Sequence, residues 1–129
     1  MTTTELIGSV LLRHPHIKLA VLFGSLAAGK ARPDSDLDLA VADDKPLSAD
    51  ARMALVADLA ERVGRPVDLI DLTSAGEPLL GQILTHGRRI LGSDECFAQL
   101  LRRHLIDDAD FAPYRSRILA ERRRAWIDR

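Results

Sequence analysis

The sequence has almost none of the residues that crosslink a protein, and it lacks a long hydrophobic run near its start. Cys96 is its single cysteine, which excludes an internal disulfide and a cysteine-based metal cage. Residues 2–12 are too short and too polar for a signal peptide or a transmembrane helix. We therefore expect a cytoplasmic protein that does not bind a membrane.

An excess of charge of one sign is also missing. Lys and Arg number 18 against 19 Asp and Glu, a formal net charge of -1, so the chain lacks the overall basic field that is typical of nucleic-acid-binding proteins. We accordingly do not expect nucleic acid as a partner. Hydrophobic residues at 47% and charged residues at 29% of 129 residues are values of an ordinary globular chain, and this length predicts one domain.

Hydrophobic periodicity and turn residues predict helices that alternate with short strands. We expect helices from Thr2 to about His14 and over residues 26–31, 49–63, 78–86, 94–105 and 107–126, and strands over 17–23, 37–42, 67–72 and 89–91. This alternation predicts an α/β fold. The four histidines lack zinc-ligand spacing and are expected at the surface or at helix ends.

Two aspartates stand close together on one predicted strand. Asp36 and Asp38 are two residues apart, so both carboxylates project from the same face of the strand. Like charges at this separation repel each other, and solvation or a bound cation reduces this repulsion. Oxygen ligands of this kind suit Mg²⁺, which also accepts phosphate oxygens. A solvated strand edge is the alternative for this pair taken alone.

A Gly-Ser turn precedes the aspartates. Gly24 and Ser25 directly follow a predicted strand, and ten residues separate Ser25 from Asp36. Glycine lets the backbone approach an oxyanion, Ser25 adds a hydroxyl donor, and the start of the next helix presents free amides. This arrangement predicts a phosphate beside the metal site.

The combined pattern, Gly24-Ser25, ten residues and Asp36-x-Asp38, resembles the polymerase beta-like nucleotidyltransferases, and the small size resembles their minimal nucleotidyltransferase (MNT) branch. The resemblance covers about residues 5–92. It implies a small mixed sheet of about four strands flanked by helices, with C-terminal helices. It also implies that Gly24 and Ser25 hold the phosphates of ATP, and that Asp36 and Asp38 bind two Mg²⁺ ions together with a third carboxylate.

Two residues are candidates for the third carboxylate. Asp68 and Asp71 lie on the same predicted strand, and the resemblance favours Asp68, which would also act as a general base. The arginine that many family members carry after the Gly-Ser turn is Ala28 here. We assign Lys30 to nucleotide binding in its place, with Arg32 as an alternative. Both residues can also be interpreted as parts of a solvated loop without a role in binding.

We divide the chain into a catalytic domain, residues 1–92, and a C-terminal helical extension of the same domain, residues 93–129. Arginines and aromatic residues alternate in the last part of the extension, which points to a partner-binding arm. A solvated helix with internal ion pairs is the alternative.

The resemblance to MNT proteins also implies a biological role. Such proteins resemble the antitoxins of HEPN/MNT toxin-antitoxin modules, which implies that AMP is transferred from ATP to a tyrosine of a partner HEPN-type RNase toxin. The short chain leaves little room for a domain that holds a small acceptor, which favours this macromolecular acceptor. Two alternatives remain: neutralisation of the partner by binding alone, and transfer to a small-molecule hydroxyl.

Overall fold

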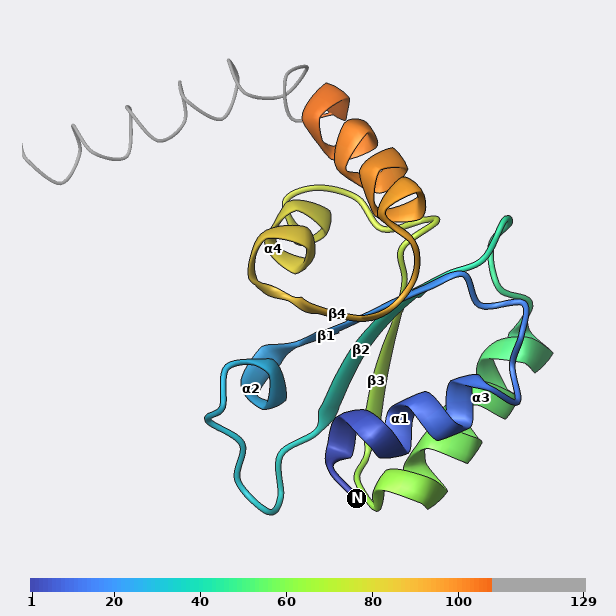
Figure 1. The fold of residues 1–129 in the computed structure, drawn as a ribbon, viewed down its shortest axis with the longest axis vertical. Coiled ribbons are helices and arrows are strands. Elements are labelled where there is room, and N and C mark those ends of the chain that lie inside the picture. Colours follow the sequence, from blue (N-terminus) through green and yellow to red (C-terminus); the bar gives the residue numbers. More distant parts are fainter. Residues whose placement is uncertain (108–129) are drawn as a thin grey trace, which may run out of the picture.

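The structure, a computed structural model, describes residues 1–107 of the chain (Figure 1). Its elements are α1 (Thr3–Leu11), β1 (Leu19–Phe23), α2 (Gly24–Ala27), β2 (Leu37–Ala42), α3 (Ala49–Val63), β3 (Val67–Asp71), α4 (Leu79–His86) and β4 (Arg88–Leu91), followed by a helix over 94–107. This is the predicted order of helices and strands. The predicted helix over 107–126 and the arginine-rich arm lie outside the described residues, apart from residue 107 itself.

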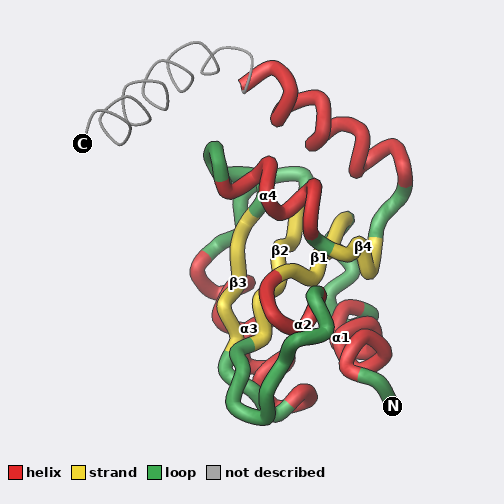
Figure 2. The backbone as a smooth tube through the Cα atoms, turned by 90° about the vertical axis from the view of Figure 1, so that its left-hand side faces the viewer, coloured by secondary structure: helices red, strands yellow, loops and turns green. Residues whose placement is uncertain are grey.

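The strands form one mixed sheet in the order β3-β2-β1-β4. Strand β1 runs antiparallel to both β2 and β4, whereas β2 and β3 are parallel. The tube view shows the four strands side by side between the helices (Figure 2). The mixed sheet of four strands flanked by helices confirms the predicted fold class.

The sheet buries a separate hydrophobic cluster on each face. Helices α1 and α3 cover one face, and α4 with the helix over 94–107 covers the other (Figure 1). Alternate residues of β2 contribute to the two clusters, Leu37, Leu39 and Val41 to the first and Ala40 and Ala42 to the second. Each large side chain buried in this way stabilises the fold by about 1.5–3 kcal/mol.

Capping residues set the ends of the long helices. The Thr2 side chain accepts from the Glu5 amide at the start of α1, and Ser48 accepts from Ala51 at the start of α3. Gly64 ends α3 in the left-handed conformation, with a φ of 75°, which glycine adopts without a steric penalty.

The predicted helix over 26–31 was wrong in its position. Helix α2 begins at Gly24, immediately after β1, and ends at Ala27. Gly29 has a φ of 72° and therefore ends the helix in the way typical of a glycine beyond a C-terminus. The Gly-Ser turn is thus itself the first turn of the helix.

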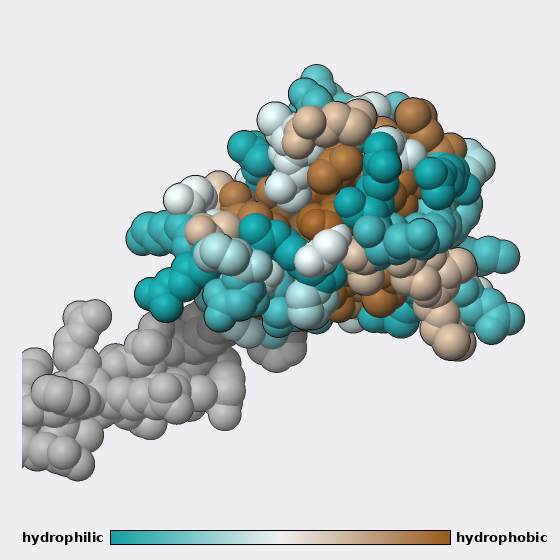
Figure 3. Space-filling model, turned by 90° about the horizontal axis from the view of Figure 1, so that it is seen from below, coloured by the Kyte–Doolittle hydropathy of each residue, from teal (hydrophilic) through white to brown (hydrophobic). Residues whose placement is uncertain are grey.

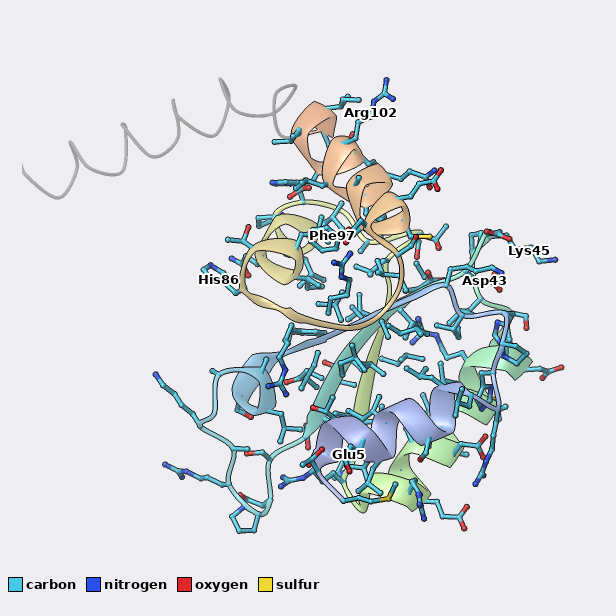
Figure 4. The ribbon with its side chains drawn as sticks, in the orientation of Figure 1. Glu5, Asp43, Lys45, His86, Phe97 and Arg102 are labelled. Atoms are coloured by element: carbon cyan, nitrogen blue, oxygen red, sulfur yellow. The ribbon has the colours of Figure 1, made fainter. Side chains whose placement is uncertain are left out.

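The helix over 94–107 packs on α4 and on the turn that follows β3. Phe97 points toward the sheet side of this helix, whereas Arg102 projects from its outer end (Figure 4). Arg103 donates to the carbonyls of Leu72 at 2.6 Å, Thr73 at 2.9 Å and Ala75 at 3.0 Å. The described part of the extension is therefore attached to the α/β unit by both apolar and polar contacts.

Two histidines contradict the expectation of surface or helix-end positions. His14 Nε2 lies 2.7 Å from Asp58 Oδ2, and His104 Nδ1 lies 2.6 Å from Glu77 Oε1. Both imidazole rings are largely shielded from solvent. Their carboxylate partners are 44 and 27 residues away in the sequence, so helical or strand periodicity does not reveal them.

Seen from the lower end of Figure 1, the molecule has hydrophilic residues around most of its outline and hydrophobic residues near the centre (Figure 3). Within residues 1–107, no helix is both long enough and apolar enough to cross a bilayer. Three exposed apolar side chains, Leu101, Leu105 and Ile106, lie near the end of the last described helix.

Candidate active site

The strand register brings three segments of the chain to one end of the sheet. Asp38, near the start of β2, is paired with Phe23 of β1 on one side and with Asp68 of β3 on the other. Gly24 directly follows Phe23, and Asp36 directly precedes β2. Gly24 and Asp68, which are 44 positions apart in the sequence, therefore flank Asp38.

Asp38 and Asp68 also share a face of the sheet. Their neighbours at alternate positions, Ala40 in β2 and Ile70 in β3, both belong to the cluster under α4. Because strand side chains alternate, the two aspartates project from that same face. The carboxylates stand at the open end of this face, where Asp38 is half-buried and Asp68 is exposed.

Asp71, the other candidate for the third carboxylate, lies elsewhere and is fully used in holding the backbone. It is 7% exposed, and its carboxylate accepts from the amides of Leu47 at 2.8 Å and Thr73 at 2.9 Å. Of the two candidates, the structure places only Asp68 beside Asp38. Its assignment as a metal ligand and base stays a prediction.

We expect opposite results from substitutions at these two aspartates. Asp71→Ala removes the acceptor of two amides and is expected to lower the free energy of unfolding by about 2–4 kcal/mol. Asp68→Ala, at an exposed position opposite the like charge of Asp38, is expected to raise it by no more than about 1 kcal/mol and to abolish nucleotidyl transfer. Urea unfolding and a transfer assay on both variants measure this. A stable, inactive Asp71 variant together with an active Asp68 variant would reverse the assignment.

The Asp38 carboxylate lies directly against the backbone of the Gly-Ser turn. Gly24 has a φ of 73°, and a Cβ atom added to it would overlap the Asp38 carboxylate. Glycine is required here for two independent reasons, since L-residues rarely adopt this conformation and the space is already occupied. The turn and the aspartates thus form one continuous surface.

The site is negatively charged. Burial raises the pKa of the Asp38 carboxyl above its ordinary value of 3.8, and the neighbouring carboxylates of Asp68 and Asp36 raise this pKa further. The ionised forms repel one another, and a bound cation would relieve this repulsion. Three carboxylates that share one end of the sheet fit a hard divalent ion such as Mg²⁺.

The carboxylates do not form a closed metal cage by themselves. Among residues 1–107, no group of three His, Cys, Asp or Glu side chains is close enough together to hold a metal ion alone. Mg²⁺ characteristically retains water and takes phosphate oxygens of the substrate as ligands beside one or two carboxylates. The donor set at this site is compatible with that mode of binding.

The remaining predicted residues lie on and after α2. Ser25 is half-buried in the first turn of the helix, and its carbonyl accepts from the Lys30 amide at 3.0 Å. Lys30 and Ala28 are exposed on the connection toward β2. The structure therefore brings Gly24, Asp38 and Asp68 together with Asp36 beside them, and it places Lys30 on the neighbouring loop.

One arginine near the site was not predicted from the sequence. Arg65, which directly precedes Pro66 and β3, donates to carbonyls of the turn before Asp36. In the sequence it stands between Gly64 and Pro66, a pattern that indicates only the end of a helix. No local signal points to a contact with residues 30 positions away.

Comparisons with known proteins agree with this geometry. Residues 5–96 match the family described as Polymerase beta, Nucleotidyltransferase. Protein adenylyltransferase MntA of Shewanella oneidensis is 36% identical over 107 residues, which covers 73% of this chain and 77% of that protein.

Solved structures show the same fold. A toxin-antitoxin crystal structure with AMP-PNP matches with a TM-score of 0.73 and 29% identity, over 90% of this chain and 98% of that chain. A complex of tri-AMPylated Shewanella oneidensis HEPN toxin with MNT antitoxin matches with a TM-score of 0.66 and 27% identity, over 92% of this chain and 99% of that chain. Family match, sequence identity and site geometry agree, and the chain belongs to the polymerase beta family of nucleotidyltransferases.

Proposed function

We propose that this protein is an antitoxin that transfers AMP from ATP to a tyrosine hydroxyl of a partner HEPN-type toxin. The observation that carries the proposal is the convergence of Gly24, Asp38 and Asp68 at one end of the sheet. The names of the relatives support the choice of acceptor, because one is a protein adenylyltransferase and another is an MNT antitoxin in complex with an AMPylated HEPN toxin.

The transfer requires one bond to form and one to break. The acceptor oxygen forms a bond to the α-phosphorus of ATP, the bond from this phosphorus to the bridging oxygen of the β-phosphate breaks, and pyrophosphate leaves. In our proposal, Asp68 accepts the proton of the acceptor hydroxyl as general base. Gly24 allows the phosphates to approach the backbone, and Ser25 donates a hydrogen bond to a phosphate oxygen. Lys30, on the loop that follows α2, would neutralise part of the negative charge of the phosphates.

Asp36, Asp38 and Asp68 would hold two Mg²⁺ ions, which when bound lower the pKa of an attacking hydroxyl and stabilise the charge of the leaving group. Hard oxygen donors at the open end of a sheet support this assignment. The close packing of Asp38 on the Gly-Ser turn would keep the metal and the phosphates adjacent.

The partner would be bound by the C-terminal extension, residues 93–129, while residues 1–92 form the catalytic domain. Leu101, Leu105 and Ile106 support this division, since apolar side chains exposed along one helix are suited to an interface. An HEPN-type RNase toxin acts where cellular RNA is found, so we place the antitoxin in the cytoplasm.

Intact-mass spectrometry tests the proposal. The purified protein is incubated with ATP, Mg²⁺ and the product of the neighbouring gene, which the proposal expects to be an HEPN-type protein. We expect the partner to gain one or more AMP units, and no gain when its acceptor tyrosine is replaced by phenylalanine. A stable complex without added mass would contradict the proposal and indicate neutralisation by binding alone.

A further inference from the structure

The turn that leads into the aspartates, residues 32–35, is held by the Arg65 side chain, which comes from another part of the chain. Arg65 Nη1 lies 2.7 Å from the Arg32 carbonyl oxygen, 2.9 Å from the Ser35 carbonyl oxygen and 3.4 Å from that of Pro33. The turn is closed internally as well, because the Ser35 amide donates to the Arg32 carbonyl at 3.0 Å. Its carbonyls thus converge on one guanidinium nitrogen.

A backbone bond continues this contact into the sheet. The Leu37 amide donates to the Pro66 carbonyl at 2.8 Å, and the parallel pairing of β2 with β3 begins at the next residue pair, Leu37 with Val67. Residues 65 and 66 therefore form hydrogen bonds with the backbone on both sides of Asp36, at Ser35 and at Leu37. Asp68 follows Arg65 by only three residues, so the contact joins the two segments that carry all three aspartates.

We propose that Arg65 is a positioning residue for the metal site, and that it fixes Asp36 and Asp38 relative to Asp68 by holding the carbonyls of the turn over 32–35. This inference rests on the proposed function, because it assigns Arg65 to the same site. Arg65 itself touches none of the reacting groups.

The chemistry of arginine suits this task. A guanidinium is permanently charged and presents several N–H donors in a rigid plane. Arg65 is half-buried, and among residues 1–107 it forms no ion pair with a carboxylate. Its donors are thus directed to backbone carbonyls of the turn. Without them, the turn over 32–35 would be fixed only by its own internal hydrogen bonds, and Asp36 would be anchored only on the side of Leu37 and β2.

The chain offers a matched control. Arg52, in α3, donates to the Leu69 carbonyl of β3 at 2.8 Å. This is the same kind of bond, from a guanidinium to a backbone carbonyl, but it ends on β3 and not on the turn before Asp36. Arg52→Met therefore removes an arginine-to-backbone bond without releasing the aspartates, whereas Arg65→Met removes the contact that the inference concerns.

The experiment measures metal binding without nucleotide or partner. Mn²⁺ is titrated into the wild-type protein and into the Arg65→Met, Arg65→Lys, Arg52→Met and Asp36→Asn/Asp38→Asn variants, and free Mn²⁺ is followed by electron paramagnetic resonance. We expect Arg65→Met to weaken binding by about 10–100-fold, the usual effect of losing a residue that orients metal ligands. Arg65→Lys, whose ammonium supplies three N–H donors, is expected to remain within about fivefold of wild type. Arg52→Met is expected to bind as wild type does.

Hydrogen exchange provides a second readout that does not depend on metal. In Arg65→Met, the hydrogen-bonded amides of Arg32, Ser35 and Leu37 are expected to exchange about tenfold faster, because the turn opens locally, while those of α1 and α3 keep their rates. Wild-type exchange in this turn would overturn the inference.

Three results separate this inference from the proposed function. Wild-type affinity in a folded Arg65→Met protein would overturn the inference and leave the proposed function intact. Equally weak Mn²⁺ binding by Arg65→Lys and Arg65→Met would also overturn the inference. If Arg65→Met does not fold, weak Mn²⁺ binding by a folded Arg65→Lys protein is sufficient to overturn it. Absence of Asp36- and Asp38-dependent binding in the wild-type protein would overturn the inference, which requires a metal site that the aspartates form without nucleotide, and the proposed function would still be decided by the transfer assay.

Discussion

Replacing Asp36 and Asp38 together by asparagine is expected to abolish AMP transfer and to raise the melting temperature of the metal-free protein. Asparagine preserves the shape of both side chains but removes the charge that would hold the metal ions. Since the metal contributes several kcal/mol of transition-state stabilisation, we expect the transfer rate to fall by about 10³-fold or more. Rate measurements with ATP, Mg²⁺ and the HEPN-type partner check this part.

The gain in stability follows from the like charges at the site. Asp38 and Asp68 are directly opposite each other in the β2–β3 pairing, and like charges in such pairs destabilise a sheet by a few tenths to about 1 kcal/mol. Their removal is expected to raise the melting temperature of the metal-free protein by about 2–5 °C. Circular dichroism melts in the presence of a chelator measure this shift.

The pH dependence of the gain provides a further check. Because the pKa of Asp38 is raised above 3.8 in the folded protein, ionisation of this carboxyl destabilises the fold at neutral pH. The stabilising effect of the asparagine variant should therefore be complete above the raised pKa and vanish below about pH 3.8, where the carboxyl is protonated in both the folded and the unfolded state. A variant that is less stable than wild type at neutral pH and retains transfer would contradict our assignment of the site.

The strands and the Asp36-x-Asp38 motif could be predicted because their signals are local. Strand β2 extends from Leu37 to Ala42 as predicted, since apolar residues fill one of its faces and turn residues precede it. Helix α3 begins after Ser48 and ends before Gly64 as predicted. In both cases a stretch of fewer than twenty residues contains the periodicity and the stop signals that define the element.

The features that sequence patterns left open depend on contacts between distant segments. Asp68 and Asp71 have similar local surroundings, and only the register of β3 against β2 places Asp68 beside Asp38. The burial of His14 against Asp58 and the contact of Arg65 with the turn over 32–35 are of the same kind. Contacts of these two kinds, between side chains and from a side chain to a backbone carbonyl, leave no periodic pattern in the sequence. The partners of His14 and Arg65 therefore could not be identified before the fold was known.

Gly24→Ala is expected to have the largest effect of any single methyl group added near the site. Alanine at a φ of 73° is strained by about 1–2 kcal/mol, and its Cβ would overlap the Asp38 carboxylate. Either the turn or Asp38 must move, which separates the phosphate-binding backbone from the metal ligands. Since a displacement of about 1 Å can lower a rate by about 10²-fold, we expect a loss of this size in AMP transfer at saturating ATP.

Gly29→Ala is the matched control, because it imposes the same backbone strain without the collision. Gly29 has a φ of 72°, and a Cβ atom added to it would meet no atom within 4 Å. We expect the same loss of about 1–2 kcal/mol in the free energy of unfolding, measured in urea, but a transfer rate within about threefold of wild type. Equal activity of the two variants would mean that strain alone, rather than displacement of Asp38, explains the effect at Gly24. Normal activity of a folded Gly24→Ala protein would contradict the proposed role of the Gly-Ser turn. It would mean that the close approach of Asp38 to the Gly24 backbone is not needed to keep the phosphates beside the aspartates.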